Sequence, residues 1–313
     1  MNIAVLDDFQ NVALELADWS PLEERGATIT VFNDHVSDPD AVVERLLPFD
    51  IVCVMRERTP LPRAIIERLP RLKLIASTGA RNASIEMAAA AERGIEVAAT
   101  GYFAEPTIEL TWSLILASAR HIPAESAAVR RGGWQETVGD DLAGKTLAIL
   151  GLGRIGGKVA TIGRAFDMEV IAWSQNLTRE MAEAAGARLV DRRDLFREAD
   201  ILTIHLVLGQ RTRGLVGAAE LSLMKPTARL VNTSRGPIVD EVALVEALRA
   251  RGIAGAALDV YDTEPLPGDH PLRTLDNVIA TPHIGYVTRA LMQTFHRDTV
   301  ENIRRWLDAH PDR

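Results

Sequence analysis

Three short segments of the sequence carry polar side chains that packing alone does not explain. They read Asn232-Thr233-Ser234-Arg235-Gly236, Asp259-Val260-Tyr261-Asp262-Thr263-Glu264 and Thr281-Pro282-His283-Ile284-Gly285. Arginine offers a planar fork of donors to a carboxylate, and histidine carries a proton near neutral pH, where a nearby glutamate favours its charged form and fixes its tautomer. Taken singly, Arg235 reads as a loop cation, Glu264 as a solvated carboxylate and His283 as a locally satisfied histidine. Together they predict a site that binds an anion and transfers a proton.

A fourth segment reads as a strand, a glycine turn and a helix. The apolar run 147–150 leads into Gly151, Gly153 and Gly156, spaced G-x-G-x-x-G, and then into the helix-like run 158–166. In a βαβ unit the first glycine allows a tight turn, the second lets a pyrophosphate approach the backbone, and the third lets the helix pack on the strand. The helix N-terminus offers N–H groups to the phosphates. The spacing therefore predicts a dinucleotide site, although a glycine-rich turn also occurs where only packing requires it.

The composition bounds the kind of protein that this chain can be. It has 313 residues, 47% of them hydrophobic and 25% charged, and a formal net charge of -8 at pH 7. These values are typical of a globular protein of about two domains, and the negative charge argues against nucleic-acid and membrane-surface partners. The single cysteine, Cys53, lies in an apolar run and allows no internal disulfide, and we expect no metal site. Because no signal peptide or membrane span is recognisable, we expect a cytoplasmic protein.

The first hundred residues alternate between apolar runs of strand length and amphipathic segments. We expect strands at residues 3–6, 28–32, 51–55, 72–76 and 95–98, and helices between them, as at residues 40–47 and 84–93. This alternation predicts a parallel sheet wrapped by helices. No glycine fingerprint follows the first strand, so we do not expect this domain to hold the dinucleotide.

A long helical pattern at residues 105–121 is expected to connect this domain to the next, and the glycine turn follows it. Further strands are expected at residues 169–173, 201–204, 229–232, 254–258 and 278–280. The last three precede the three polar segments, which should converge because ligands bind outside the carboxyl ends of parallel strands. The final helix, at residues 288–310, has no strand of its own to cover, so we expect it to fold back onto the first domain.

These elements predict an α/β protein with two doubly wound parallel-sheet (Rossmann-like) domains and a cleft between them. The expected substrate (catalytic) domain is discontinuous and comprises residues 1–100 with 288–313. The expected dinucleotide-binding domain comprises residues 101–287.

As a set, the four motifs resemble those of the D-isomer-specific 2-hydroxyacid dehydrogenase family, and the resemblance covers nearly the whole chain. It implies that Arg235, Glu264 and His283 are the catalytic residues. A further motif of the family, Leu-x-x-His followed by a threonine, is matched at residues 202–205 and at Thr212, although the usual proline near Val207 is missing.

The resemblance also implies which residues bind the cofactor and the substrate. The expected cofactor-binding residues are Thr107, Gly151, Gly153, Arg154, Ile155, Gly156, Ser174, His205, Thr212, Thr233, Ser234, Arg235, Asp259, His283 and Gly285. The expected substrate-binding residues are Arg58, Gly79, Ala80, Arg81, Arg235 and His283, where backbone N–H groups of the loop 77–84 hold a carboxylate. Arg81 stands where many relatives carry aspartate, and Ser174 stands where NAD-dependent relatives carry the acid that binds the adenosine ribose. The expected cofactor is therefore NAD(H) or NADP(H), with the choice left open.

The activity implied is that of an NAD(P)-dependent oxidoreductase, which transfers a hydride between the dinucleotide and C2 of a D-2-hydroxy acid or 2-keto acid. Hydroxypyruvate-, glyoxylate- and phosphoglycerate-like substrates remain open. Arg58 and Arg81 favour a second anionic group on the substrate, unless Arg58 pairs with Glu57 and Arg81 points away. The expected partners are this small anionic substrate and a second copy of the chain, as in most relatives, with residues 131–134 as a candidate contact.

The resemblance to the family also implies two other functions. A branch of the family serves as corepressors, so a dinucleotide-sensing binding protein is the alternative, although all three catalytic positions are filled here. Formate-oxidising relatives carry glutamine where this chain has Glu264, which disfavours that reaction.

Overall fold

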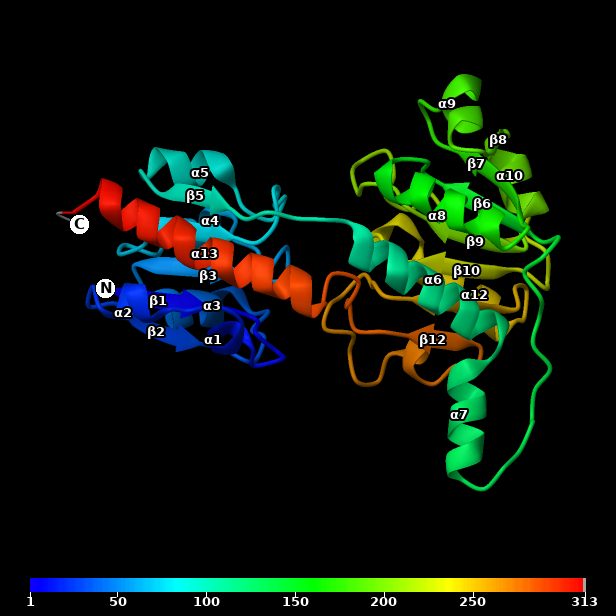
Figure 1. Cartoon of the computed structure of the whole chain (residues 1–313), viewed down its shortest axis with the longest axis horizontal. Coiled ribbons are helices and arrows are strands. Elements are labelled where there is room, and N and C mark those ends of the chain that lie inside the picture. The colour runs from blue at the N-terminus through cyan, green and yellow to red at the C-terminus, as the bar shows by residue number, and fades with distance from the viewer. Residues whose placement is uncertain (312–313) are drawn as a thin grey trace. The chain divides into compact units, whose positions relative to one another are not determined.

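The computed structural model describes residues 1–311 and divides into two compact units (Figure 1). Unit 1 comprises residues 1–103 together with the segment that begins at Val287, and unit 2 comprises Ala104–Tyr286. Each unit is built on one parallel sheet. The predicted fold class of two parallel-sheet α/β domains is confirmed.

The sheet of unit 1 has the strand order β2-β1-β3-β4-β5. Its strands are β1 (Asn2–Val5), β2 (Thr28–Val31), β3 (Ile51–Val54), β4 (Leu74–Ser77) and β5 (Glu96–Ala99). Its helices are α1 (Ala13–Leu16), α2 (Ser20–Glu23), α3 (Pro39–Leu46), α4 (Arg63–Ile66), α5 (Met87–Glu92) and α13 (Arg289–Ala309). The fourth strand begins two residues later than the predicted run 72–76, because sheet pairing starts only where Leu74 meets Ile51.

The inner strands of unit 1, β1, β3 and β4, are almost entirely apolar because both faces of the sheet are covered. Alternate residues such as Ala4, Val52 and Ile75 pack against α3, α4 and α5. The residues between them pack against α1, α2 and the C-terminal helix α13, whose Ile303 and Trp306 are buried. A parallel sheet covered on both faces needs such runs. The return of α13 makes unit 1 discontinuous in sequence.

Unit 2 has the strand order β12-β11-β10-β9-β6-β7-β8. Its strands are β6 (Thr146–Leu150), β7 (Glu169–Trp173), β8 (Arg188–Leu189), β9 (Ile201–Ile204), β10 (Arg229–Asn232), β11 (Gly255–Leu258) and β12 (Val278–Ala280). Its helices are α6 (Glu105–Ala119), α7 (Ile122–Arg130), α8 (Arg154–Ala165), α9 (Arg179–Ala184), α10 (Arg192–Glu198), α11 (Ala218–Leu221) and α12 (Glu241–Arg249), with the short 3-10 turns η1 (Gly236–Ile238) and η2 (Pro271–Arg273). The edge strand β8 and the helix α7 were not predicted.

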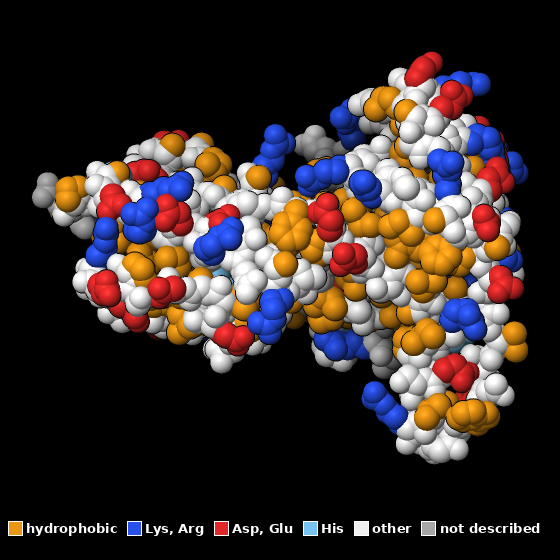
Figure 2. Space-filling model, viewed as in Figure 1, with side chains coloured by type: hydrophobic (Ala, Val, Ile, Leu, Met, Phe, Trp, Pro, Cys, Tyr) orange, Lys and Arg blue, Asp and Glu red, His pale blue; other side chains and the backbone are white. Residues whose placement is uncertain are grey.

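Helix α7 was not predicted because it has no apolar stripe facing its own unit. Only Ala128 is buried, whereas Ile122 and Val129 are exposed. The helix and the loop after it project from unit 2 (Figure 1), and Figure 2 shows hydrophobic side chains gathered at the tip of this projection. Among residues 1–311, none of the helices combines the length and apolarity that crossing a membrane requires.

Candidate active site

The three glycines of the turn after β6 meet different surroundings. A Cβ on Gly151 would lie 2.7 Å from the carbonyl oxygen of His205, and Gly151 has a φ of 104°, so only glycine fits there. A Cβ on Gly156 would lie 2.2 Å from the carbonyl oxygen of Gly151. At Gly153, by contrast, no described atom outside its immediate neighbours lies within 4 Å of the Cβ position. Two glycines therefore serve packing, and the middle one leaves the backbone open to a ligand.

The residues at this turn fit a dinucleotide pyrophosphate. Gly153 is the N-cap of α8, a helix of 12 residues. Within the described chain no side chain caps this N-terminus. Such a helix end presents backbone N–H groups and the positive end of the helix dipole to phosphates. The turn also lies where β6 is flanked by β7 and β9, the topological switch point at which doubly wound sheets bind dinucleotides.

The next strand ends close to a position that governs cofactor choice. Strand β7 ends at Trp173 and Ser174 follows it, partly buried, with Gln175 and Asn176 exposed. A carboxylate at this place would accept hydrogen bonds from a ribose 2′-hydroxyl and repel a 2′-phosphate. Serine and the two amides do neither strongly, so this strand end carries no charge that selects between the two dinucleotides.

Buried Asp259 ties together the loops that follow β11 and β12. Its Oδ1 accepts hydrogen bonds from Thr281 Oγ1 at 2.7 Å and from the Ile284 amide at 2.8 Å. Its Oδ2 accepts one from the Gly285 amide, also at 2.8 Å. Burial raises the pKa of Asp259, and these three donors oppose that shift. The carboxyl group thus holds the chain on both sides of Pro282 and His283 in place.

His283 faces Glu264 across the same two loops. His283 Nδ1 lies 2.5 Å from Glu264 Oε2, and Glu264 Oε1 accepts a hydrogen bond from the Tyr261 amide at 3.0 Å. Because a carboxylate only accepts, Nδ1 carries the hydrogen, and exchange of a proton with a substrate would use Nε2. The histidine backbone has a φ of 53°, in the left-handed region. The rings of His283 and Tyr286 pack in a T-shaped arrangement, with 5.8 Å between their centroids.

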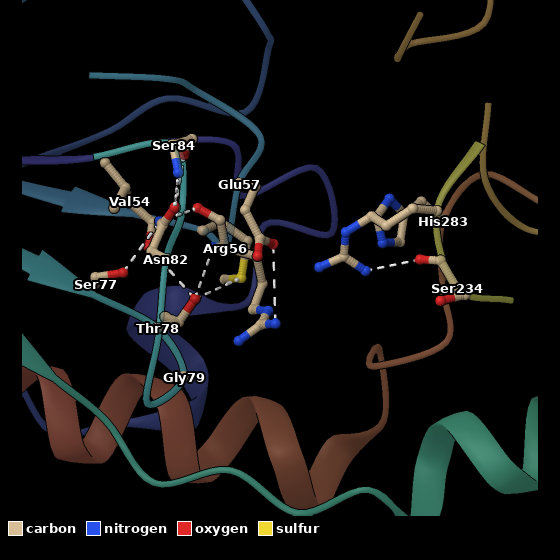
Figure 3. A network of polar contacts seen from close by, with 12 residues as sticks. Val54, Arg56, Glu57, Ser77, Thr78, Gly79, Asn82, Ser84, Ser234 and His283 are labelled. Atoms are coloured by element: carbon tan, nitrogen blue, oxygen red, sulfur yellow. Dashed lines mark hydrogen bonds and ion pairs between the residues drawn. The ribbon is translucent and has the colours of Figure 1, made fainter. Parts of the chain in front are cut away.

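Arg235 follows β10, the neighbouring strand, in a loop that Asn232 organises. The side-chain Nδ2 of Asn232 donates to the Arg235 carbonyl, and its Oδ1 accepts from the backbone amide of Ser234, each at 3.0 Å. Arg235 Nη1 donates to the Ser234 carbonyl at 2.7 Å, and Figure 3 shows Ser234 with His283. A Cβ on Gly236 would lie 2.0 Å from the Tyr261 carbonyl carbon, so glycine allows the loop after β10 to touch the loop after β11. The structure thus brings the segments of Arg235, Glu264 and His283 to one edge of the unit 2 sheet.

The expected cofactor-binding hydroxyls take part in bonds that shape this edge. Thr107 Oγ1 donates to the Gly285 carbonyl at 3.1 Å, and Thr233 Oγ1 pairs with Thr111 Oγ1 at 2.7 Å. These bonds hold α6 against the loops after β12 and β10. Ser234 Oγ donates to the Leu206 carbonyl.

His205 and Thr212 belong to the loop that follows β9. His205 Nε2 lies 2.9 Å from Thr203 Oγ1, and burial lowers the pKa of His205 to about 3, so the ring is neutral at physiological pH. Thr212 Oγ1 donates to the Val207 carbonyl at 2.7 Å and accepts from the Gly209 amide at 2.8 Å. These two bonds close the loop around Val207.

In the loop 77–84, one of the backbone N–H groups expected to bind a substrate carboxylate already has a partner within the protein. The Gly79 amide donates to Thr100 Oγ1 at 2.8 Å, so the fold already uses this N–H group. Ala80 and Arg81 are exposed. The guanidinium of Arg58 lies over the ring of Phe9, 5.2 Å from its centroid.

Sequence reasoning missed Arg56, which lies against this loop. A Cβ on Gly79 would lie only 1.8 Å from Arg56 Nη1. The Arg56 amide donates to Thr78 Oγ1 at 2.8 Å, and Asn82 Nδ2 donates to the Arg56 carbonyl at 2.5 Å (Figure 3). Arg56 also has a φ of 53° and places its guanidinium 5.2 Å from the centroid of the Tyr102 ring. Its position directly after a predicted strand was a signal in the sequence.

In the part of the chain that the structure describes, no group of three or more His, Cys, Asp or Glu side chains is arranged to hold a metal ion.

Comparison with known proteins agrees with this geometry. Residues 112–285 match the family described as "D-isomer specific 2-hydroxyacid dehydrogenase, NAD binding domain". The chain is 44% identical over 249 residues to a glyoxylate reductase of Aeropyrum pernix, which covers 76% of this chain and 74% of that protein. It is 40% identical over 272 residues to a D-3-phosphoglycerate dehydrogenase of Methanocaldococcus jannaschii, which covers 86% of this chain and 52% of that protein. The chain thus spans about half the length of the second relative.

A solved structure is similar over almost the whole chain. It is a phosphoglycerate oxidoreductase from Vibrio cholerae O395, with a TM-score of 0.93, 37% identity and 99% of each chain covered. The predicted family and the predicted nicotinamide dinucleotide cofactor are confirmed. The chain belongs to the D-isomer-specific 2-hydroxyacid dehydrogenase family.

Proposed function

We propose that this protein reduces 2-keto acids to D-2-hydroxy acids with a nicotinamide dinucleotide, and that Arg235, Glu264 and His283 carry the reaction. One observation supports this most: the 2.5 Å pair of His283 and Glu264 lies beside the Arg235 loop in the unit whose glycine turn fits a dinucleotide. An anion-binding group and a proton carrier beside a dinucleotide site are what reduction of a keto acid requires.

Each residue has a separate part in this proposal. The dinucleotide supplies the hydride when it is bound at the N-terminus of α8. Arg235 binds the substrate carboxylate and polarises the keto oxygen through its fork of donors. His283 donates a proton to that oxygen from Nε2, and Glu264 holds the ring and stabilises its protonated form.

The substrate class that we propose carries a second anionic or strongly polar group. Arg56 supports this, because its guanidinium lies against Gly79 in the loop expected to bind substrate. Arg58, and Arg81 at the exposed tip of that loop, are the further candidates. The names of the similar proteins include both a small keto acid, glyoxylate, and a phosphorylated acid, phosphoglycerate. Arginine forks recognise phosphate and carboxylate groups through paired charge-assisted hydrogen bonds.

For the cofactor, we propose that both NADH and NADPH are used. Ser174 replaces the acid that would reject a 2′-phosphate, and no arginine directly follows it. Values of kcat/KM that differ by more than about 10³, or roughly 4 kcal/mol, would contradict this proposal, because such a gap needs a dedicated charge.

We further propose that the protein is a cytoplasmic homodimer joined through unit 2. The projecting segment that starts with α7 exposes the apolar side chains Ile122, Val129, Trp134 and Val138. Exposed apolar clusters of this kind mark interaction sites on proteins. Light scattering at several protein concentrations tests the dimer, and the double substitution Ile122→Asp with Val129→Asp should yield a monomer.

The activity itself is tested by initial rates of NADH and NADPH oxidation against glyoxylate, pyruvate, hydroxypyruvate and phosphorylated 2-keto acids. We expect turnover with at least one of them and none when the keto acid is omitted. A protein that binds the dinucleotide but reduces none of these acids would contradict the proposed enzyme and favour a sensing role.

A further inference from the structure

A second polar cluster lies at the carboxyl end of the sheet in unit 1. Its members, Asp7, His35 and Thr59, follow three adjacent strands, β1, β2 and β3. His35 Nδ1 lies 2.8 Å from Asp7 Oδ1, and Thr59 Oγ1 donates to Asp7 Oδ2 at 2.7 Å. The side chains of Asp7 and His35 are 1% and 8% exposed, and Thr59 is 4% exposed. Both carboxylate oxygens of Asp7 are thus satisfied by side chains far away in sequence.

The cluster occupies the topological switch point of unit 1. The strand order 2-1-3-4-5 places β1 between β2 and β3, and the hydrogen bond from Thr59 to Asp7 spans the ends of β1 and β3. In doubly wound sheets of this order, ligands bind at that switch point. Here it is filled with buried polar side chains. The backbone at Asp7 has a φ of 58°, a strained conformation for a residue other than glycine that persists only where the surroundings enforce it.

Thr59 also ends the turn that carries Arg56 and Arg58, residues 56–59, which we name the arginine turn. At its start, the Arg56 amide and carbonyl are bonded to Thr78 and Asn82 of the substrate loop (Figure 3). At its end, Thr59 is bonded to Asp7. Between them the Arg58 guanidinium lies over Phe9, which follows Asp7 and Asp8 in the chain. The turn is therefore anchored at both ends, and the second anchor is the buried cluster.

We propose that Asp7, His35 and Thr59 are positioning residues, which hold the arginine turn so that Arg56 can bind the second anionic group of the substrate. This inference rests on the proposed function and deepens it. His35 holds Asp7 from one side, and Asp7 in turn accepts the hydroxyl hydrogen of Thr59. An anchor of this kind lowers the entropy that Arg56 loses on binding, so its removal weakens binding of the group that Arg56 recognises and leaves the chemical step unchanged.

The test compares Thr59→Val, which removes the hydroxyl but keeps the shape, with Thr59→Ser, which keeps the hydroxyl. We expect Thr59→Val to raise the KM of a phosphorylated or dicarboxylic 2-keto acid by roughly 5–10-fold, with kcat and the KM of glyoxylate changed less than about twofold. Thr59→Ser should restore the wild-type KM. His35→Asn, which can still donate to Asp7, should stay near wild type, whereas His35→Leu should resemble Thr59→Val. Thr299→Val, which alters another buried threonine of unit 1, is the control.

Two further results separate the possible failures. A wild type that is inactive with every keto acid would overturn the proposed function, whereas an active wild type whose KM is matched by Thr59→Val would overturn the positioning role. If Thr59→Val lost kcat equally with all substrates, the cluster would have a purely structural role, and the positioning role would be overturned. Hydrogen–deuterium exchange tests the anchor without any substrate: amides 56–59 should exchange faster in Thr59→Val than in Thr59→Ser, and equal rates would overturn the inference.

Discussion

The two parallel sheets of this protein differ most at their topological switch points. In unit 2 the switch point lies beside β6, where Gly153 leaves open backbone before a helix N-terminus. In unit 1 it lies between β1 and β3, where the carboxylate of Asp7 is enclosed by Thr59 and His35. The same architecture can thus leave room for a ligand, where glycines carry no side chains. It can also form a rigid support, where polar side chains fill the switch point.

This difference separates the expected roles of the two units. We propose that His283, at a strand end of unit 2, takes part in the chemical step, so its loss should lower kcat. We propose that Arg56, at a strand end of unit 1, binds the substrate, so its loss should raise KM. His283→Ala and Arg56→Ala test this division.

The largest effect is expected at the proton donor of unit 2. His283→Ala should lower kcat by roughly 10²–10⁴, the usual value of a positioned proton donor, and leave the dinucleotide Kd almost unchanged. The matched control is His270→Ala, because His270 forms a similar pair with Glu241, at 3.1 Å and with similar exposure. A His283→Ala protein with full kcat, or an equal loss of kcat in His270→Ala, would contradict the assignment of His283 as the proton donor.

The next effect concerns the glycine turn and compares two adjacent residues. Gly156→Ala places a Cβ against the Gly151 carbonyl oxygen, so it should lower the free energy of unfolding by about 1–3 kcal/mol and weaken dinucleotide binding. Around Gly157 the described structure leaves the Cβ position open. Gly157→Ala should therefore raise the free energy of unfolding by about 0.4–1 kcal/mol, because alanine restricts the unfolded chain. Urea unfolding of both variants measures this, and equal shifts would contradict the packing argument.

Acid should weaken unit 2 through His205. Its pKa is lowered to about 3 by burial, whereas in the unfolded chain it is near 6.5. Between these values the unfolded state binds the proton and the folded state does not, so the stabilisation is present above about pH 6.5 and is lost as the pH falls toward 3.

His205 as a residue is only partly buried, so the effect is expected to be smaller than the full shift implies. Between about pH 7 and about pH 4.5, wild type should lose about 1–2 kcal/mol more unfolding free energy than His205→Gln, which no longer titrates there. Urea unfolding at both pH values measures the difference. An identical loss in the two proteins would show that His205 does not contribute.

The smallest expected effect distinguishes two arginines of unit 1. Arg56→Ala should lower kcat/KM for a dianionic 2-keto acid by about 10-fold or more, through KM, with little change for glyoxylate, because one charge-assisted hydrogen bond is lost. Arg81→Ala, at an exposed position, should change either value by less than about threefold. A larger loss of kcat/KM in Arg81→Ala than in Arg56→Ala would assign the second anion site to Arg81, which the sequence alone indicated together with Arg58.

The convergence of the polar segments in unit 2 could be predicted because its signals are local. The glycine spacing lies within six residues, and Arg235, Glu264 and His283 each follow a recognisable strand by a few residues. The order of parallel strands then places those strand ends along one edge. The pairing of His283 with Glu264, over a separation of 19 residues, followed from the family resemblance and the known chemistry of the pair.

The unit 1 site was harder to predict because its signals are distant in sequence. Arg56 and Arg58 are indistinguishable as letters, and only the bonds of Arg56 to Thr78 and Asn82, 22 and 26 residues away, separate them. The bond of Thr59 to Asp7 crosses 52 residues. No periodicity or spacing encodes such contacts, because they depend on which strands become neighbours in the sheet.

The most direct test of the central claim is the chirality of the product. Wild-type protein should reduce hydroxypyruvate with NADH or NADPH, and enantioselective analysis should find D-glycerate, with the rate falling to near background in His283→Ala. Formation of L-glycerate, or of both enantiomers equally, would contradict the assignment of this chain as a D-2-hydroxyacid dehydrogenase, as would the absence of a 2-hydroxy acid product from every keto acid of the panel with either dinucleotide.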